Sequence, residues 1–185
     1  MKTRMLGRFL MAAALLAGAA AASTKGSTNL PQSDSEIAAN VRHEVLMYPH
    51  YSIWDDLSFR VAEGNVSLTG EVNQPYKKQD IERLVQKVPG VASVTNDIKV
   101  LPLSSMDDRL RLQVASAIYR DPILSGYGIA AVPAIHIIVE NGHVTLTGTV
   151  ASDMEKQIAG MRAASGLSFG PITNNLVVEN PAGKS

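Results

Sequence analysis

Histidine and aspartate side chains can bind a metal ion or transfer a proton. The chain has four histidines and two pairs of adjacent aspartates: His43, His50, His136, His143, Asp55–Asp56 and Asp107–Asp108. A metal site would need a tighter cluster with a third ligand on the same face. Adjacent residues of a helix or strand also do not converge on one reacting atom. We therefore interpret both aspartate pairs as structural, and His136 and His143 as solvated residues of a strand pair.

The common catalytic and nucleotide-binding motifs are missing. No serine lies in a G-x-S-x-G motif, and the sequence contains neither a Walker loop nor a dinucleotide-binding fingerprint. The chain has no cysteine, which excludes disulfides, thiolate chemistry and a lipid-anchoring cysteine. It carries 17 basic and 17 acidic residues, whereas nucleic-acid binders usually show a basic stripe. We predict a non-enzymatic protein with no cofactor, no metal site, no nucleic-acid partner and no lipid anchor.

The N-terminus has the pattern of a targeting segment. Lys2, Arg4 and Arg8 precede an apolar run over residues 9–22, which ends in three alanines before Ser23. A membrane-spanning helix needs about 20 apolar residues, so this shorter run favours a cleaved signal peptide over residues 1–22. Its removal takes away three basic residues and no acidic one, leaving 14 basic against 17 acidic residues and a net charge of −3. We expect export, with a periplasmic location.

One short phrase occurs twice, as AEGNVSLTGEV over residues 62–72 and as ENGHVTLTGTV over residues 140–150. In each copy, apolar and polar residues alternate on both sides of a two-residue turn, Glu63–Gly64 or Asn141–Gly142. Such turns need positive φ and therefore favour glycine and asparagine. A two-residue turn fixes the register, so the apolar residues of each hairpin share one face, the core face. They are Leu57, Phe59, Val61, Val66 and Leu68 in the first copy and Ile135, Ile137, Val139, Val144 and Leu146 in the second.

Helical patterns flank each hairpin. Ser33 and Glu36 form a capping box, as do Ser152 and Glu155, and Pro75 suits a first helical position. Apolar spacing predicts four buried helix faces: Ile37, Val41 and Val45; Ile81, Leu84, Val85 and Val88; Leu110, Val114 and Ile118; and Met154, Ile158 and Met161. A third strand closes each copy, at residues 91–100 and 171–178.

Each half of the chain therefore predicts the order helix, strand, strand, helix, strand. A strand–helix–strand step gives a parallel strand pair and the hairpin gives an antiparallel one, so each sheet should be mixed. Two helices on one face of a three-stranded sheet make an α+β unit. We expect a signal peptide at 1–22, a flexible linker at 23–32, domains at 33–100 and 104–179, and a tail at 180–185.

The repeated unit resembles the BON domain, a module of bacterial envelope proteins. The residues that carry the resemblance are Gly64–Val72 with Val88–Ile98 in the first copy, and Gly142–Val150 with Thr173–Leu176 in the second. The second copy departs from the pattern, because Ser168–Phe169 stand where a Gly-Val pair belongs. The resemblance implies two tandem αββαβ domains, and a signal peptide followed by two such domains is similar to the osmotically inducible periplasmic protein Y family.

The resemblance implies a non-enzymatic envelope protein that binds phospholipid surfaces or envelope components, with a part in envelope maintenance or osmotic stress. The expected partner is an anionic phospholipid or membrane surface, bound peripherally. The alternative is a soluble periplasmic stress chaperone or an adaptor for other envelope proteins. The two copies differ at a five-residue insertion within 125–133 and near the altered loop. We therefore expect ligand-binding residues there: Tyr127, Ile129, Val132, Lys156, Arg162, Leu167 and Phe169.

Overall fold

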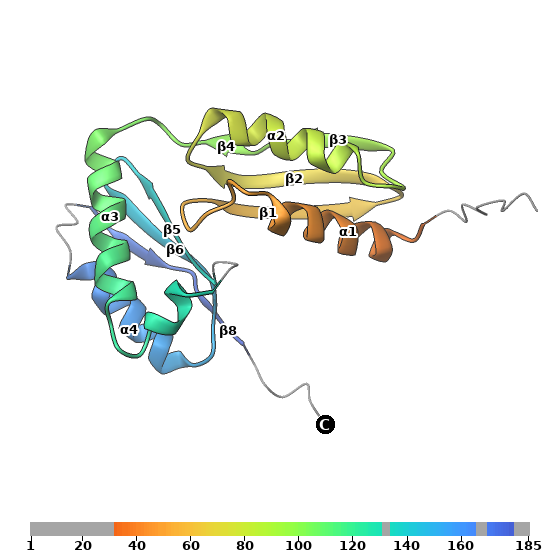
Figure 1. Cartoon of the computed structure of the whole chain (residues 1–185). Helices are drawn as coiled ribbons and strands as arrows, with labels where there is room; N and C mark the ends of the chain where they lie inside the picture. Colours follow the sequence, from red (N-terminus) through yellow and green to blue (C-terminus); the bar gives the residue numbers. More distant parts are fainter. Residues whose placement is uncertain (1–31, 131–133, 166–169, 180–185) are drawn as a thin grey trace, which may run out of the picture. The chain divides into compact units, whose positions relative to one another are not determined.

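The computed structural model describes residues 32–130, 134–165 and 170–179, which form two copies of one α+β unit (Figure 1). The first unit contains α1 (Asp34–Met47), β1 (Asp56–Ala62), β2 (Asn65–Val72), α2 (Pro75–Gln86), β3 (Ser93–Asn96) and β4 (Lys99–Val100). The second contains α3 (Ser105–Tyr119), the short 3-10 helix η1 (Ser125–Gly128), β5 (Ile135–Glu140), β6 (His143–Val150), α4 (Asp153–Ala164), β7 (Ile172–Asn174) and β8 (Val177–Val178). Two helices cover one face of each sheet, as predicted.

The hairpin strand after the turn is the centre of each sheet. β2 pairs antiparallel with β1 and parallel with β3 and β4, and β6 does the same with β5, β7 and β8. The predicted register is confirmed, because Phe59 lies opposite Leu68 and Val139 lies opposite Val144. At the turns, Glu63 and Asn141 take φ values of 52° and 51°, which is the left-handed conformation that a two-residue turn requires.

The predicted third strand is interrupted in both units. In the first unit the Asn96 side chain donates to the Lys78 carbonyl of α2 at 3.0 Å and accepts from the Ile98 N–H at 3.2 Å. This local bond bends the chain, so β3 ends at Asn96 and Ile98 turns inward to 1% exposure. Asn174 forms the equivalent bonds with Lys156 of α4 and with Leu176. An asparagine side chain thus ties the third strand of each unit to the preceding helix.

Three of the four predicted helix faces are confirmed, and the fourth is wrong at Met154 and Met161, although Ile158 is partly buried against the core. α4 buries Ala159 and Ala163, whereas Met154 and Met161 are 59% and 63% exposed. The reason is close packing, since a Cβ on Gly160 would lie only 2.9 Å from the Asn174 amide nitrogen. The small residues let α4 approach the sheet, and the methionines face outward.

The prediction that His136 is solvated is also wrong. His136 is 6% exposed, and its neighbour on the non-core face of β5, Ile138, is equally buried. The outer face of this strand is covered, with the Tyr51 ring centred 5.5 Å from the His136 ring. His143 is half-buried, and its Nε2 lies 2.9 Å from the Thr173 hydroxyl.

The predicted signal peptide and the tail lie outside the described residues. Within the described ranges, none of the helices has the length and apolar character needed to cross a bilayer.

Candidate binding site

One aspartate of each predicted pair, Asp55 in the first and Asp107 in the second, is buried and has a structural role. Asp34 and Asp107 occupy the same position at the start of α1 and α3, and each carboxylate accepts two N–H groups from the hairpin turn of its unit. Asp34 accepts from Glu63 and Gly64 at 2.8 and 2.9 Å. Asp107 accepts from Asn141 and Gly142 at 3.0 and 2.8 Å. These bonds fix the glycine-containing turn to the helix start, so both carboxylate oxygens of the buried Asp107 have a structural role.

Asp55 belongs to a buried ion pair beneath α2. It is 0% exposed, and Lys77 donates to it at 2.6 Å. The same carboxylate accepts from the N–H groups of Ser52 and Asn73 at 3.0 and 3.1 Å. Such hydrogen bonds are what a buried carboxylate needs to remain charged at acceptable cost. Asp55 therefore has a structural role, as predicted for the first aspartate pair.

In the second unit, Tyr127 takes over the position of that ion pair. Its hydroxyl accepts from the Ala151 N–H at 2.9 Å and donates to the Glu155 carboxylate at 3.0 Å. Ala151 and Glu155 correspond to Asn73 and Lys77, 78 residues earlier. Burial is the main cause of a raised pKa for Tyr127, so its hydroxyl stays protonated at neutral pH. Tyr127 therefore supports its own domain, although it was predicted as a binding residue.

The rest of the insertion divides into buried and exposed parts. Leu124, just before η1, is fully buried in the core of the second unit, whereas Ile129, just after it, is 86% exposed. Val132, Leu167 and Phe169 lie outside the described residues. Among the predicted binding residues that are described, the structure thus leaves Ile129 as the exposed apolar one.

The two predicted basic residues lie on α4. Lys156 is partly buried, and Arg162 extends from the last turn. The Arg162 Nε donates to Asp121 at 2.7 Å, and Arg162 is half-exposed while Asp121 is buried. The hydrogen bond from the Ile123 N–H, aided by Arg162, holds the pKa of Asp121 below its usual range. Asp121 is therefore ionised at neutral pH and keeps Arg162 at the edge of α3.

Arg162 is part of a groove of about 650 Å³ between α3 and α4. Leu112, Arg120 and Pro122 also line it, and Leu112 is 64% exposed. Met161, next to Arg162, is 63% exposed. Two arginines thus lie beside the exposed Leu112 in this groove, which we call the α3–α4 groove. The sequence pattern missed Leu112 and Arg120. Leu112 lies off the buried stripe of α3, and this was the available signal.

The first unit does not repeat this chemistry. Ala39, Met47 and Leu84 occupy the positions that correspond to Leu112, Arg120 and Arg162. The basic groove is therefore particular to the second unit.

The architecture defines a class, a pair of small two-layer α+β domains. Within the described ranges, no group of three or more His, Asp or Glu side chains is placed to hold a metal ion. The family model for the BON domain matches residues 33–102 and 107–180. The chain belongs to the BON domain family, with two tandem copies. BON domains are non-catalytic binding modules associated with interaction with membranes and phospholipids.

Other comparisons give only distant similarity. No curated protein matched the chain. The C-terminal domain of CdsD, a structural protein of the type III secretion system of Chlamydia trachomatis, is 12% identical, with a TM-score of 0.33 over 80% of this chain and 100% of that one. A second CdsD structure is also 12% identical, with a TM-score of 0.28 over 78% of this chain and 92% of that one.

Proposed function

We propose that this protein is an exported, non-enzymatic envelope protein that binds anionic phospholipid surfaces peripherally through its second BON domain. In this proposal residues 1–22 are a cleaved signal peptide and the mature protein acts in the periplasm. It would resemble the osmotically inducible periplasmic protein Y in architecture and in a role during osmotic stress or envelope maintenance. The α3–α4 groove is the observation that carries the proposal.

The groove combines the two properties that interfacial binding requires. Arginine guanidinium groups bind phosphate oxygens, and exposed apolar side chains beside them can enter the boundary between headgroups and acyl chains. Arg120 and Arg162 supply the charge, while Leu112 supplies an apolar contact within the groove. The exposed Met161 precedes Arg162 in the chain and adds a second apolar side chain on α4. Asp121 pairs with Arg162 and offsets part of its positive charge. Arg120 is therefore the stronger headgroup ligand in this proposal.

Exposed apolar residues elsewhere in the second domain extend the proposed contact. Met154 at the start of α4 and Ile129 after η1 are 59% and 86% exposed. Single exposed apolar residues are common on protein surfaces, so the proposed role of these two depends on the neighbouring basic groove. We propose that these two, with Val132, Leu167 and Phe169, add contacts around the basic groove.

Flotation of the mature protein with vesicles tests the proposal. At low salt, we expect the protein to float with phosphatidylglycerol-containing vesicles and to remain at the bottom with pure phosphatidylcholine. The double variant L112S/R120Q should reduce the floated fraction at least about fivefold, because each basic contact with an anionic surface contributes about 1 kcal/mol.

The variant M47S/R60Q is the matched control. It replaces an exposed methionine and an exposed arginine of the first domain, and it should float as the unmodified protein does. Failure of the unmodified protein to float with anionic vesicles would contradict lipid binding. Equal loss in both double variants would contradict the α3–α4 groove as its site.

A further inference from the structure

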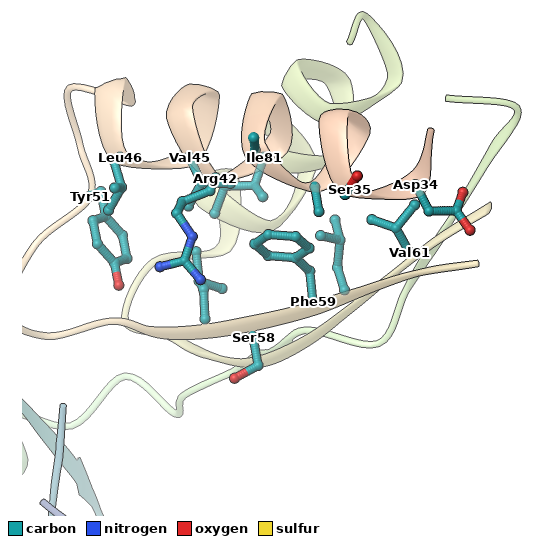
Figure 2. A pocket seen from close by; sticks show the side chains of 14 residues that line it. Asp34, Ser35, Arg42, Val45, Leu46, Tyr51, Ser58, Phe59, Val61 and Ile81 are labelled. Carbon is teal, nitrogen blue, oxygen red and sulfur yellow. The ribbon is translucent and has the colours of Figure 1, made fainter. Parts of the chain in front are cut away.

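The first domain has an open sheet edge beside a groove. β1 is the outer strand of its sheet, paired with β2 alone. Between β1 and α1 lies a groove of about 700 Å³, shown in Figure 2. Phe59 lies between helix and strand, and Arg42 extends from α1 toward the strand. The remaining lining is mostly apolar and includes Val45, Leu46, Leu57 and Val61.

The hairpin register determines which backbone groups face this groove. Ala62 and Asn65 close a two-residue turn, so they form a hydrogen-bonded pair, and such pairs alternate along antiparallel strands. The N–H and C=O groups of Leu57, Phe59 and Val61 therefore point away from β2. Among the residues that the structure describes, no hydrogen bond reaches these outward groups.

In the second domain, two side chains of α3 donate to carbonyl groups on the same edge. The Arg111 guanidinium donates to the Val139 carbonyl at 2.6 Å, and the Tyr119 hydroxyl donates to the Ile135 carbonyl at 2.8 Å. Burial raises the pKa of Tyr119 to about 12, which keeps that hydroxyl a donor. Ile135, Ile137 and Val139 are all 0% exposed.

The first domain lacks these donors at the corresponding positions. Ala38 replaces Arg111, and Leu46 replaces Tyr119, 73 residues earlier. Neither side chain can donate a hydrogen bond. Leu57, Phe59 and Val61 correspondingly remain half-buried. The two domains therefore share one fold but differ at the outer strand. Side chains of α3 donate hydrogen bonds to β5, whereas α1 has no such donors at the equivalent positions.

We propose that the groove between α1 and β1 binds an extended polypeptide segment, which adds a strand to the edge of the first domain's sheet. Main-chain hydrogen bonds to an exposed edge are a common mode of peptide recognition, with alternate side chains entering the adjoining groove. The proposed partner is a segment with apolar residues at every second position, such as an unfolded β-strand of another envelope protein. This role is independent of the lipid surface assigned to the second domain.

The unpaired backbone groups of β1 favour a peptide over a lipid chain in this groove. An acyl chain would cover the outward N–H and C=O groups of Leu57, Phe59 and Val61 without bonding to them, and an unsatisfied buried polar group is costly. A peptide backbone satisfies the same groups. We propose an antiparallel pairing, in which the apolar residues of the peptide lie opposite Leu57, Phe59 and Val61, so their own N–H groups are the ones that bond to β1.

That geometry gives a sharp test by NMR titration of the isotope-labelled mature protein. The probe is a blocked peptide of about seven residues, the length of β1, with valine alternating with threonine and a glutamate at each end to suit Arg42. We expect it to shift the amide signals of Leu57, Phe59 and Val61 and to slow their hydrogen exchange. N-methylation of the valine amides should weaken binding at least about tenfold, whereas N-methylation of the threonine amides should not.

The second domain supplies the matching protein variant. A38R/L46Y introduces the two donors found at Arg111 and Tyr119, and it should fold stably and bind the probe at least about tenfold more weakly. N40R/H43Y places the same residue types on the other side of α1, away from the groove residues, and it should bind normally. Circular dichroism confirms that each variant is folded.

Three outcomes would overturn the proposal. The first is saturating peptide that leaves the three β1 amides unchanged. The second is equal binding by both N-methylated peptides, or by A38R/L46Y and N40R/H43Y. The third is protection of these amides by phosphatidylglycerol vesicles in place of the peptide, which would make the groove a lipid site.

Discussion

Two different sets of residues form equivalent hydrogen bonds beneath the second helix of each domain. In the first domain, Asp55 accepts the Asn73 N–H and pairs with Lys77. In the second, the Tyr127 hydroxyl accepts the Ala151 N–H and donates to Glu155. A neutral hydroxyl avoids the desolvation cost of a buried ion pair. The insertion that sets the second domain apart thus has a structural purpose, because it delivers Tyr127 to this position.

The buried ion pair gives a prediction at the residue scale. K77M leaves the Asp55 carboxylate fully buried with hydrogen bonds but without its cation, and breaking such a pair typically costs about 3 kcal/mol or more. A urea titration followed by circular dichroism should show this loss in the free energy of unfolding. The exposed substitution K87M should change it by less than about 0.5 kcal/mol. D55N/K77M should recover part of the loss, since it removes the unpaired charge, and a K77M effect no larger than that of K87M would refute this account.

At the scale of elements, the sequence predicted what depends on local spacing. The two-residue turns fixed the strand register, and helical spacing identified the buried faces of α1, α2 and α3. The α4 prediction failed because hydrophobicity alone favoured Met154 and Met161, while close packing against Asn174 required alanine and glycine. The groove residues Leu112 and Arg120 were missed for a related reason. They lie together with Arg162 only once α3 and α4 are packed side by side.

The bond between helix start and hairpin turn gives a prediction for the second domain. In D107N, an amide replaces a buried carboxylate that accepts from Asn141 and Gly142. Hydrogen bonds to a charged group contribute about 1.5 to 3 kcal/mol, so we expect a loss of unfolding free energy in this range. Hydrogen exchange at the two turn amides should accelerate. D153N is the control, because Asp153 is exposed in the first turn of α4. It also removes a negative charge near a helix N-terminus, but it does not affect the hairpin turn. Unchanged exchange in D107N would contradict the role assigned to Asp107.

At the scale of the whole molecule, net charge limits how the protein can meet a membrane. Removal of residues 1–22 would leave a net charge of −3, so an anionic surface repels the mature chain as a whole. Attraction must then come from a focused basic surface, and the α3–α4 groove is the one we propose. The peptide groove of the first domain has a different source of affinity, because backbone hydrogen bonds and apolar contacts do not depend on net charge.

This difference predicts unequal responses to salt. The Debye length falls from about 14 Å at 0.05 M salt to about 6 Å at 0.3 M, so exposed charges are screened over this range. Flotation of the mature protein with anionic vesicles should fall several-fold between these concentrations, because Arg120 and Arg162 lie at the surface. Binding of the alternating peptide, measured by NMR in the same buffers, should change less than about twofold, since hydrophobic burial is not screened. Salt-insensitive flotation would show that apolar insertion dominates membrane binding. A steep loss of peptide binding would show that Arg42, and not the β1 backbone, holds the peptide.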